Sequence, residues 1–256
     1  MPGEQQLDKA AEKIRKSNFT AAFTGSGISV ESGIPPFRGK DGIWSKYDPK
    51  SLELGFFFEY PKQSWRVIKE IFYNYFGAAR SNRAHFVLAE MEQRGLLQCV
   101  ITQNIDNLHQ QAGSKTVYEF HGNSNKMLCT SCYTLFDVHE IDMNVLPPSC
   151  LSCNGLLKPD FIFFGEGIPQ DAFRNSLDAA GKADVMIVVG TTGEVMPAAQ
   201  MPYVTKQKGG TIIEVNTEIS RLTHTVTDIF LEGKASEVLD KLAERLFADQ
   251  EQTSQP

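Results

Sequence analysis

Four of the five cysteines form two Cys-x-x-Cys pairs, Cys129 with Cys132 and Cys150 with Cys153. The 17 residues from 133 to 149 separate the pairs, a spacing that is typical of zinc sites with four thiolate ligands. Two such turns complete a tetrahedron without an open coordination position, so the pattern predicts one structural zinc ion. Disulfides or redox-active pairs are the alternative, and a reducing compartment disfavours them.

The segment Gly25-Ser26-Gly27 directly follows an apolar run, 19–23, that is predicted to be a buried strand. Glycines at this point let the backbone approach a pyrophosphate and direct N–H groups toward it. The third glycine of the dinucleotide fingerprint is absent, because Val30 stands at its position. Taken alone, this motif is explained equally well by a structural turn between a strand and a helix.

Polar side chains cluster in 102–113, directly after a second predicted strand. Ligands bind at the carboxyl ends of strands in a doubly wound sheet, so Gln103, Asn104 and Asp106 are candidates for binding one. The structural alternative is a helix cap formed by Asn104 or Asp106. His109 is expected to pack or cap rather than react.

His121 follows a third predicted strand, 116–120, and should lie near the two preceding loops. With a reference pKa of ~6.5, a histidine at this place can act as a general base near neutral pH. Isolated histidines are more often ordinary core or surface residues, which is our interpretation of His85, His139 and His224. The sequence contains no hydride-transfer motif, serine nucleophile elbow or P-loop beside these residues.

Short apolar runs alternate with segments of helical periodicity along most of the chain. Runs that are apolar on both faces are typical of a parallel sheet with helices on both sides. We therefore predict an α/β fold with a doubly wound, mostly parallel, Rossmann-like sheet. The predicted strands are 19–23, 97–102, 116–120, 185–190, 211–216 and 228–231, and the predicted helices include 7–14, 65–76, 84–91, 171–180, 198–208 and 235–246.

Two segments interrupt this alternation, and we interpret them as insertions that pack together into a smaller domain. One is the aromatic-rich helical stretch 39–83, and the other is the zinc-binding stretch 121–158. The polar tail 249–256 is expected to be disordered. The large Rossmann-like domain then comprises residues 1–38, 84–120 and 159–248.

The chain has 256 residues and a net charge of −6, so its overall field repels nucleic acid. No apolar run reaches the ~18–20 residues that a membrane helix requires. The N-terminal segment lacks the apolar core of a secretory signal. We therefore expect a cytoplasmic protein without nucleic-acid or membrane partners; the sequence makes no prediction of its oligomeric state.

The motifs of this chain and their order resemble those of sirtuins, a family of NAD-dependent protein-lysine deacylases. The resemblance covers nearly the whole chain. The motifs are TGSGISVESGIPPFRG (24–39), TQNIDNLH (102–109), His121-Gly122, the two cysteine pairs, KPDFIFFGE (158–166), GTTGEVMPAA (190–199) and EVN (214–216). The resemblance implies a transferase-type enzyme that consumes NAD as a co-substrate and holds one structural zinc per chain. Its partner would be a protein or peptide that contains acyl-lysine.

The resemblance also implies roles for individual residues. His121 would be the general base, and Asn104 and Asp106 would complete the catalytic site. NAD would contact Gly25, Ser26, Gly27, Phe37, Arg38, Gln103, Asn104, Ile105, Asp106, Gly190, Thr191, Thr192, Asn216, Lys234 and Ala235. The substrate would contact Phe37, Ile162, Phe164, Gly165, Glu166, Gly193 and Val195, with 165–168 and 193–196 each adding a strand to the peptide.

In sirtuin-like chemistry, the acyl oxygen attacks a ribose carbon of NAD, nicotinamide leaves, and His121 activates the neighbouring ribose hydroxyl. The products are free lysine, nicotinamide and O-acyl-ADP-ribose. Two alternatives remain open: a mono-ADP-ribosyltransferase, which shares the first step, and a non-catalytic module that binds NAD or ADP-ribose. Ser26, Thr192 and Pro36 replace the usual Ala, Ser and Asp of the family, which should alter activity rather than abolish it.

Sirtuins that prefer succinyl- or malonyl-lysine resemble one another in a Tyr-x-x-Arg pair beside the acyl tunnel. Alignment on Trp65 places Ile68 and Ile71 at these two positions, and alignment on Tyr73 places Phe76 at that of the Arg. An acyl carboxylate would then be buried without a partner, at a cost of several kcal/mol. We therefore predict a preference for neutral acyl groups, with acetyl first.

Overall fold

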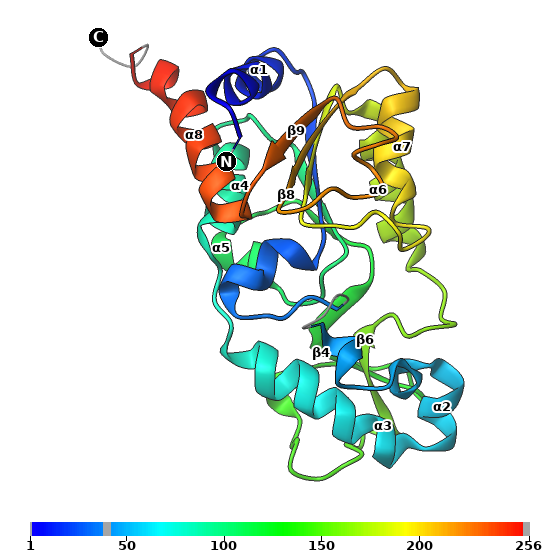
Figure 1. Cartoon of the computed structure of the whole chain (residues 1–256). Coiled ribbons are helices and arrows are strands. Elements are labelled where there is room, and N and C mark those ends of the chain that lie inside the picture. The colour runs from blue at the N-terminus through cyan, green and yellow to red at the C-terminus, as the bar shows by residue number, and fades with distance from the viewer. Residues whose placement is uncertain (1, 38–41, 253–256) are drawn as a thin grey trace.

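The large lobe of the molecule is built on a six-stranded sheet in the computed structural model, which describes residues 2–37 and 42–252. The order is β3-β2-β1-β7-β8-β9, and all neighbours run parallel. Figure 1 labels β8 and β9 of this sheet, in the upper part of the molecule. The order reverses between β1 and β7, as in a Rossmann-like sheet, which confirms the predicted fold class. The strands are β1 (Thr20–Thr24), β2 (Cys99–Thr102), β3 (Val117–Glu119), β7 (Val185–Val189), β8 (Thr211–Asn216) and β9 (Ile229–Glu232).

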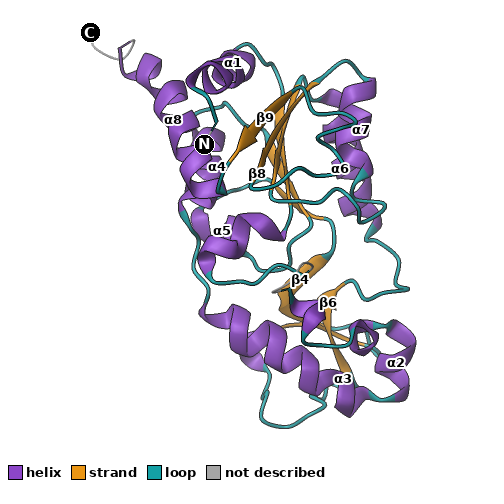
Figure 2. Cartoon of the chain, viewed as in Figure 1, coloured by secondary structure: helices purple, strands orange, loops and turns teal. Residues whose placement is uncertain are grey.

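Helices cover both faces of this sheet (Figure 2). One layer contains α1 (Glu4–Arg15), α4 (Arg83–Gln93) and α8 (Ala235–Gln252), and the other contains α6 (Gln170–Lys182) and α7 (Gln200–Gln207). The short helix α5 (Leu108–Ala112) follows β2. Because α8 continues to Gln252, residues 249–252 are helical and do not belong to the disordered tail that the sequence predicts; residues 253–256 lie outside the described part.

The strands have continuous apolar sequences because both of their faces are buried. All five residues of β1 and all five of β7 are buried. Ala22 and Ile187 face the core beneath the first helical layer, whereas Phe23 and Val188 face the core beneath α6 and α7. This is the arrangement expected of a parallel sheet between two layers of helices.

The small lobe contains a three-stranded antiparallel sheet in the order β5-β4-β6, which the sequence did not predict. Its elements are β4 (Gly122–Cys129), β5 (Leu135–Asp137), β6 (Leu157–Phe161), α2 (Leu54–Glu59) and α3 (Pro61–Ile68). The single helix predicted over 65–76 is α3 followed by a π-helical stretch. The non-α helical segments of the chain are Ser26–Ser32, Ile43–Ser45, Pro49–Leu52, Lys69–Tyr75, Phe76–Ala78 and Val138–Glu140.

One apolar core joins the two insertions in the small lobe. Trp65 and Phe72 from the helical insertion pack in the same cluster as Met127 and Leu157 from the sheet, and Trp65 Nε1 donates to the Leu157 carbonyl at 2.9 Å. The boundary expected between residues 158 and 159 falls inside β6, so the small lobe extends further along the chain.

Within the described residues, no helix is long and apolar enough to cross a membrane.

Candidate functional site

The loops that follow β1, β2, β7 and β8 meet where the strand order reverses. The Gly27 N–H donates to the Gly190 carbonyl at 2.8 Å. Gln103 Nε2 donates to Thr191 Oγ1 at 3.1 Å, and Asn216 Nδ2 donates to the Thr191 carbonyl at 3.0 Å. Ligands of open α/β sheets bind in the crevice at this point. The structure therefore brings together four of the loops that the sequence predicts for one site.

The glycines of two of these loops are required by contact between backbones. A Cβ atom added at Gly27 would lie 2.6 Å from Gly190 Cα, and one added at Gly190 would lie 2.4 Å from the Ile28 nitrogen. A Cβ atom at Gly25 would lie 2.8 Å from the Gly190 oxygen. Gly190 also has a φ of 62°, which favours glycine. These glycines thus have a structural reason that is independent of any bound pyrophosphate.

A hydrogen-bond network joins Asn104 and Asp106 to Ser29. Asn104 Nδ2 lies 3.2 Å from both the Gly25 carbonyl and Ser29 Oγ, and Ser29 Oγ donates to Asp106 Oδ2 at 2.7 Å. Asp106 Oδ1 also accepts the Leu108 N–H at 3.0 Å, so it contacts the start of α5 as well. Burial raises the pKa of Asp106, and these hydrogen bonds oppose the rise. Ser29 is fully buried, and no local pattern distinguishes it in the sequence.

His121 is held in one tautomer by the carbonyl of Gln103. Its Nδ1 lies 3.0 Å from that oxygen. Since a carbonyl can only accept, Nδ1 carries the proton and Nε2 is the basic nitrogen of the neutral ring. Burial lowers the pKa of His121, and the hydrogen bond to Gln103 opposes this effect. A half-buried neutral imidazole of this kind is suited to act as a general base near pH 7.

His109 packs inside the protein, as the sequence analysis expected. Its Nε2 lies 2.9 Å from Thr24 Oγ1, and its ring packs edge-on against His85 with 4.9 Å between centroids. Burial lowers the pKa of His85 to about 4 and that of His109 well below its usual value. Both histidines are therefore neutral core residues at neutral pH.

Phe37 lies among aromatic rings of the small lobe. Its ring centroid is 5.5 Å from that of Trp44, 6.4 Å from that of Phe72 and 6.5 Å from that of Phe76. Phe164 is 50% exposed, and its ring centroid lies 6.0 Å from that of Trp44. Trp44 thus connects the two aromatic residues predicted to contact substrate, although the sequence analysis did not identify it.

The other residues predicted to contact the peptide lie on two turns. The Ile162 N–H donates to the His121 carbonyl at 2.8 Å, so the chain after β6 runs beside the histidine. Gly165 is exposed and has a φ of 87°. Gly193 has a φ of 70° and is buried beneath Leu222, while Val195 is half-buried.

One carboxylate oxygen of Glu166 is engaged within the protein. Its Oε2 lies 3.1 Å from Lys158 Nζ and accepts the Phe163 N–H at 2.9 Å. The resemblance to sirtuins implies substrate contact for Glu166 and no individual role for Lys158. The only signal in the sequence is that both charges occur in the single motif 158–166.

The remaining residues predicted to contact NAD range from exposed to buried positions. The Gly233 N–H donates to the Asn216 carbonyl at 2.9 Å, which brings exposed Lys234 and buried Ala235 beside the end of β8. Ile105 is 7% exposed and packs in the core of the small lobe. Ser26 is half-buried and Thr192 is exposed at the same reversal point, whereas Arg38 lies outside the described residues.

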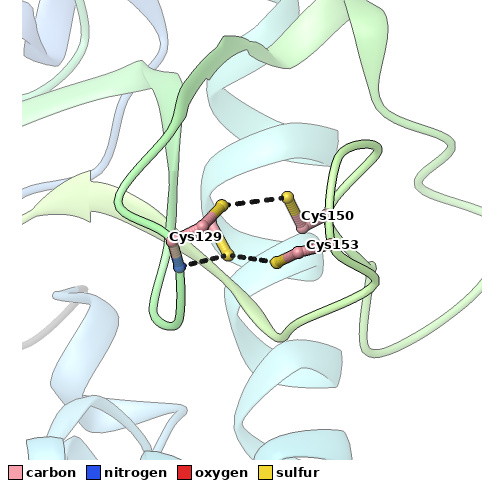
Figure 3. Close-up of side chains that lie close together, drawn as sticks. Cys129, Cys150 and Cys153 are labelled. Carbon is pink, nitrogen blue, oxygen red and sulfur yellow. Dashed lines mark hydrogen bonds between the residues drawn. The ribbon is translucent and has the colours of Figure 1, made fainter.

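The two cysteine pairs meet at the end of β4, and Figure 3 labels Cys129, Cys150 and Cys153 of this cluster. All four sulfurs lie within 4.8 Å of one another, with Cys129 Sγ 3.5 Å from Cys153 Sγ and Cys132 Sγ 3.7 Å from Cys150 Sγ. None of them forms a disulfide. Zn–S bonds of ~2.3 Å in a tetrahedron require sulfurs roughly 3.8 Å apart. The cluster therefore fits one zinc ion with a full set of thiolate ligands.

Three comparisons, with a family pattern, with relatives and with solved structures, agree on one family. The sequence pattern of the Sir2 family matches residues 25–197. An NAD-dependent protein deacylase from Pyrococcus furiosus is 44% identical over 250 residues, which cover 94% of this chain and 98% of that protein. A crystal structure of a Sir2 homologue bound to NAD has a TM-score of 0.86 and 41% identity, with 93% of each chain covered.

A further solved structure, a Sir2 protein with a p53 peptide and NAD⁺, has a TM-score of 0.84 and 34% identity, covering 96% of this chain and 98% of that one. The similarity thus spans both lobes, the reversal point of the sheet and the cysteine cluster. The chain belongs to the Sir2 family, the sirtuins.

Proposed function

We propose that this NAD-dependent protein deacylase of the Sir2 family uses His121 as its general base. The tautomer of His121 supports this role most directly, because the Gln103 carbonyl holds the Nδ1 proton and leaves Nε2 basic. Nε2 would take the proton of a ribose hydroxyl. Asn104 and Asp106, held by Ser29, would orient the ribose and carboxamide next to it.

When bound, NAD supplies the ADP-ribose group that accepts the acyl group, and it is consumed in the reaction. The hydrogen bonds that connect the loops at the reversal point support a binding site there, since phosphates of dinucleotides bind at this place in doubly wound sheets. Arg38 is a further candidate for contact with phosphate. The proposed contacts are Gly25, Ser26, Gly27, Gly190, Thr191 and Thr192 for the phosphates, Asn216 for the ribose, and Lys234 and Ala235 for the adenine.

The acyl group that fits this site best is neutral. Ile68 and Ile71 are 0% and 2% exposed, and the Tyr73 hydroxyl already donates to the Ser124 carbonyl at 3.0 Å. The exposed Arg80 donates to the carbonyl of the preceding residue. An acyl carboxylate among these groups would lose its hydration without gaining a charged partner. We infer that acetyl-lysine is preferred, with longer aliphatic groups next.

The acyl-lysine peptide would lie along residues 165–168 and 193–196, which would each add a strand to it. The exposed Phe164 and Gly165 support this placement. We also propose a cytoplasmic location, because four unpaired zinc-binding cysteines suit a reducing compartment.

One experiment tests the activity and the acyl preference together. The protein is incubated with NAD and matched acetyl-, butyryl- and succinyl-lysine versions of one peptide, and the products are identified by mass spectrometry. We expect O-acetyl-ADP-ribose and a higher kcat/KM for acetyl than for succinyl. Faster desuccinylation would contradict the acyl preference. ADP-ribosylated protein without deacylation would favour the transferase alternative, and no turnover would favour the binding module.

A further inference from the structure

A buried lysine lies at the base of the turn that is proposed to contact the peptide. Lys158 belongs to β6 and is 4% exposed. Its Nζ donates to the Pro159 carbonyl at 2.8 Å and to the Phe161 carbonyl at 2.7 Å, and lies 3.1 Å from Glu166 Oε2. The three donors of the ammonium group thus have three acceptors. Removing an ammonium from water is costly, so its burial here must be offset by these specific contacts.

Lys158 and Glu166 together close the turn 162–166. Glu166 Oε2 also accepts the Phe163 N–H at 2.9 Å, and the Glu166 N–H donates to the Phe163 carbonyl at 3.0 Å. The Lys158 ammonium lies 4.4 Å from the centroid of the Phe163 ring, within the range of a cation–π contact. One buried charge therefore contacts both ends of the turn.

The same turn is connected to His121 and to the helical insertion. The Ile162 N–H donates to the His121 carbonyl at 2.8 Å. The Phe164 N–H donates to the Leu52 carbonyl at 2.8 Å, and the Phe164 carbonyl accepts the Leu54 N–H at 3.0 Å. The conformation of the turn thus sets where the exposed Phe164 ring lies relative to the proposed base.

We propose that Lys158, through its ion pair with Glu166, is a positioning residue for the acyl-lysine peptide. The inference rests on the proposed function, in which this turn contacts the substrate. Among residues 2–37 and 42–252, the side chains of the pair form hydrogen bonds and ion contacts only within 158–166. Its loss should therefore weaken peptide binding and leave NAD binding largely intact. Its role is to hold the turn in one conformation before the peptide arrives.

The test measures KM for an acetyl-lysine peptide, KM for NAD and kcat in Lys158→Met, Glu166→Gln and the double variant. Each single variant leaves one charged group without its partner, whereas the double variant removes both charges, so the double variant should be more stable than either single one. We expect the peptide KM to rise at least about tenfold in all variants that fold, while the NAD KM stays within about twofold.

Stability and positioning are separated by the double variant. If the pair only stabilises the fold, the peptide KM should recover together with the melting temperature. If it positions the turn, the peptide KM should stay raised although stability returns. Lys126→Met is the matched control, because Lys126 forms an exposed ion pair with Asp137 in the same small sheet, and its kinetics should equal those of the unchanged protein.

Two results would overturn the proposal: a peptide KM within about twofold of the unchanged protein in the double variant, or equal increases in the peptide and NAD KM values. A wrong proposed function would give a different result, because the unchanged protein would then not deacetylate the peptide at all. Zinc content of one per chain in every variant would show that the cysteine cluster is preserved.

Discussion

The two lobes bury their interiors in different ways. In the large lobe, two layers of helices cover strands such as β1 and β7 on both faces. In the small lobe β5 has only three residues, and β4 has both buried and exposed positions. Its core is rich in aromatic rings and ends at the four-thiolate cluster. The stability of a lobe with a small apolar core depends more on a bound metal. We therefore expect the two lobes to unfold separately.

Separate unfolding of the two lobes can be measured because the spectroscopic probes are divided between them. Both tryptophans of the chain, Trp44 and Trp65, pack in the small-lobe core. Most helices and the six-stranded sheet belong to the large lobe. Tryptophan fluorescence therefore reports on the small lobe, and far-ultraviolet circular dichroism reports mainly on the large lobe.

The largest effect is expected from Cys150→Ala. The remaining three thiolates leave the tetrahedron incomplete, and a structural zinc contributes roughly 10–16 kcal/mol in small zinc domains. We expect loss of zinc, an altered tryptophan spectrum and loss of deacylation, with most of the circular dichroism retained. Cys99→Ala, in the large lobe, should keep one zinc. A zinc-free Cys150→Ala protein with native fluorescence and activity would show that the lobe folds without metal.

His121→Ala should lower the deacylation rate by ~10²–10⁴-fold, the usual range for one acid–base group. NAD binding, followed by calorimetry, should persist, since the ring is proposed to act on a hydroxyl. His139→Ala, an exposed histidine of the small lobe, is the control and should be fully active. Because burial lowers the pKa of His121, the base stays neutral in mild acid, and the acid limb of kcat/KM should lie below pH ~6.5.

Matched core truncations in the two lobes should each cost ~2–5 kcal/mol of stability. Leu239 in α8 and Leu157 in β6 are both fully buried. Leu239→Ala should lower the midpoint of the circular dichroism transition in urea, whereas Leu157→Ala should lower that of the fluorescence transition. Equal shifts of both transitions in both variants would mean that the lobes unfold as one cooperative unit.

The smallest effect concerns acid stability of the large lobe. His85 has a pKa of about 4 in the folded protein, so the unfolded chain binds its proton first as the pH falls below ~6.5. The stability associated with the neutral ring is present above that pH and declines toward pH 4, by roughly 3 kcal/mol. Urea unfolding followed by circular dichroism from pH 7.5 to 4.5 measures this slope.

The matched variant is His85→Gln. His85 occupies the third position of the capping box that Asn82 begins, and Gln is a usual residue at that position. The variant should therefore keep the cap and show a shallower dependence on pH. An unchanged slope would assign the acid sensitivity to other groups.

Several features were predicted correctly because they are local in the sequence. Each cysteine pair contains both of its sulfurs within one turn, and strands such as Val185–Val189 are apolar throughout because helices cover both faces. His121 was identified by its place after a strand, since all parallel strands end at the same edge of the sheet. The fold class and the four cysteines of the cluster therefore followed from the sequence alone, whereas the role of His121 as base stays a prediction.

Other features depend on contacts between distant residues. Ser29 donates to Asp106, 77 residues away, and Gly27 contacts Gly190. The antiparallel sheet of the small lobe and the internal role of Glu166 were also not apparent, because a hydrogen bond between distant residues leaves no period or spacing in the sequence. Only the packing of the whole chain decides which of its polar groups meet, such as the carboxylate of Glu166 with the ammonium group of Lys158.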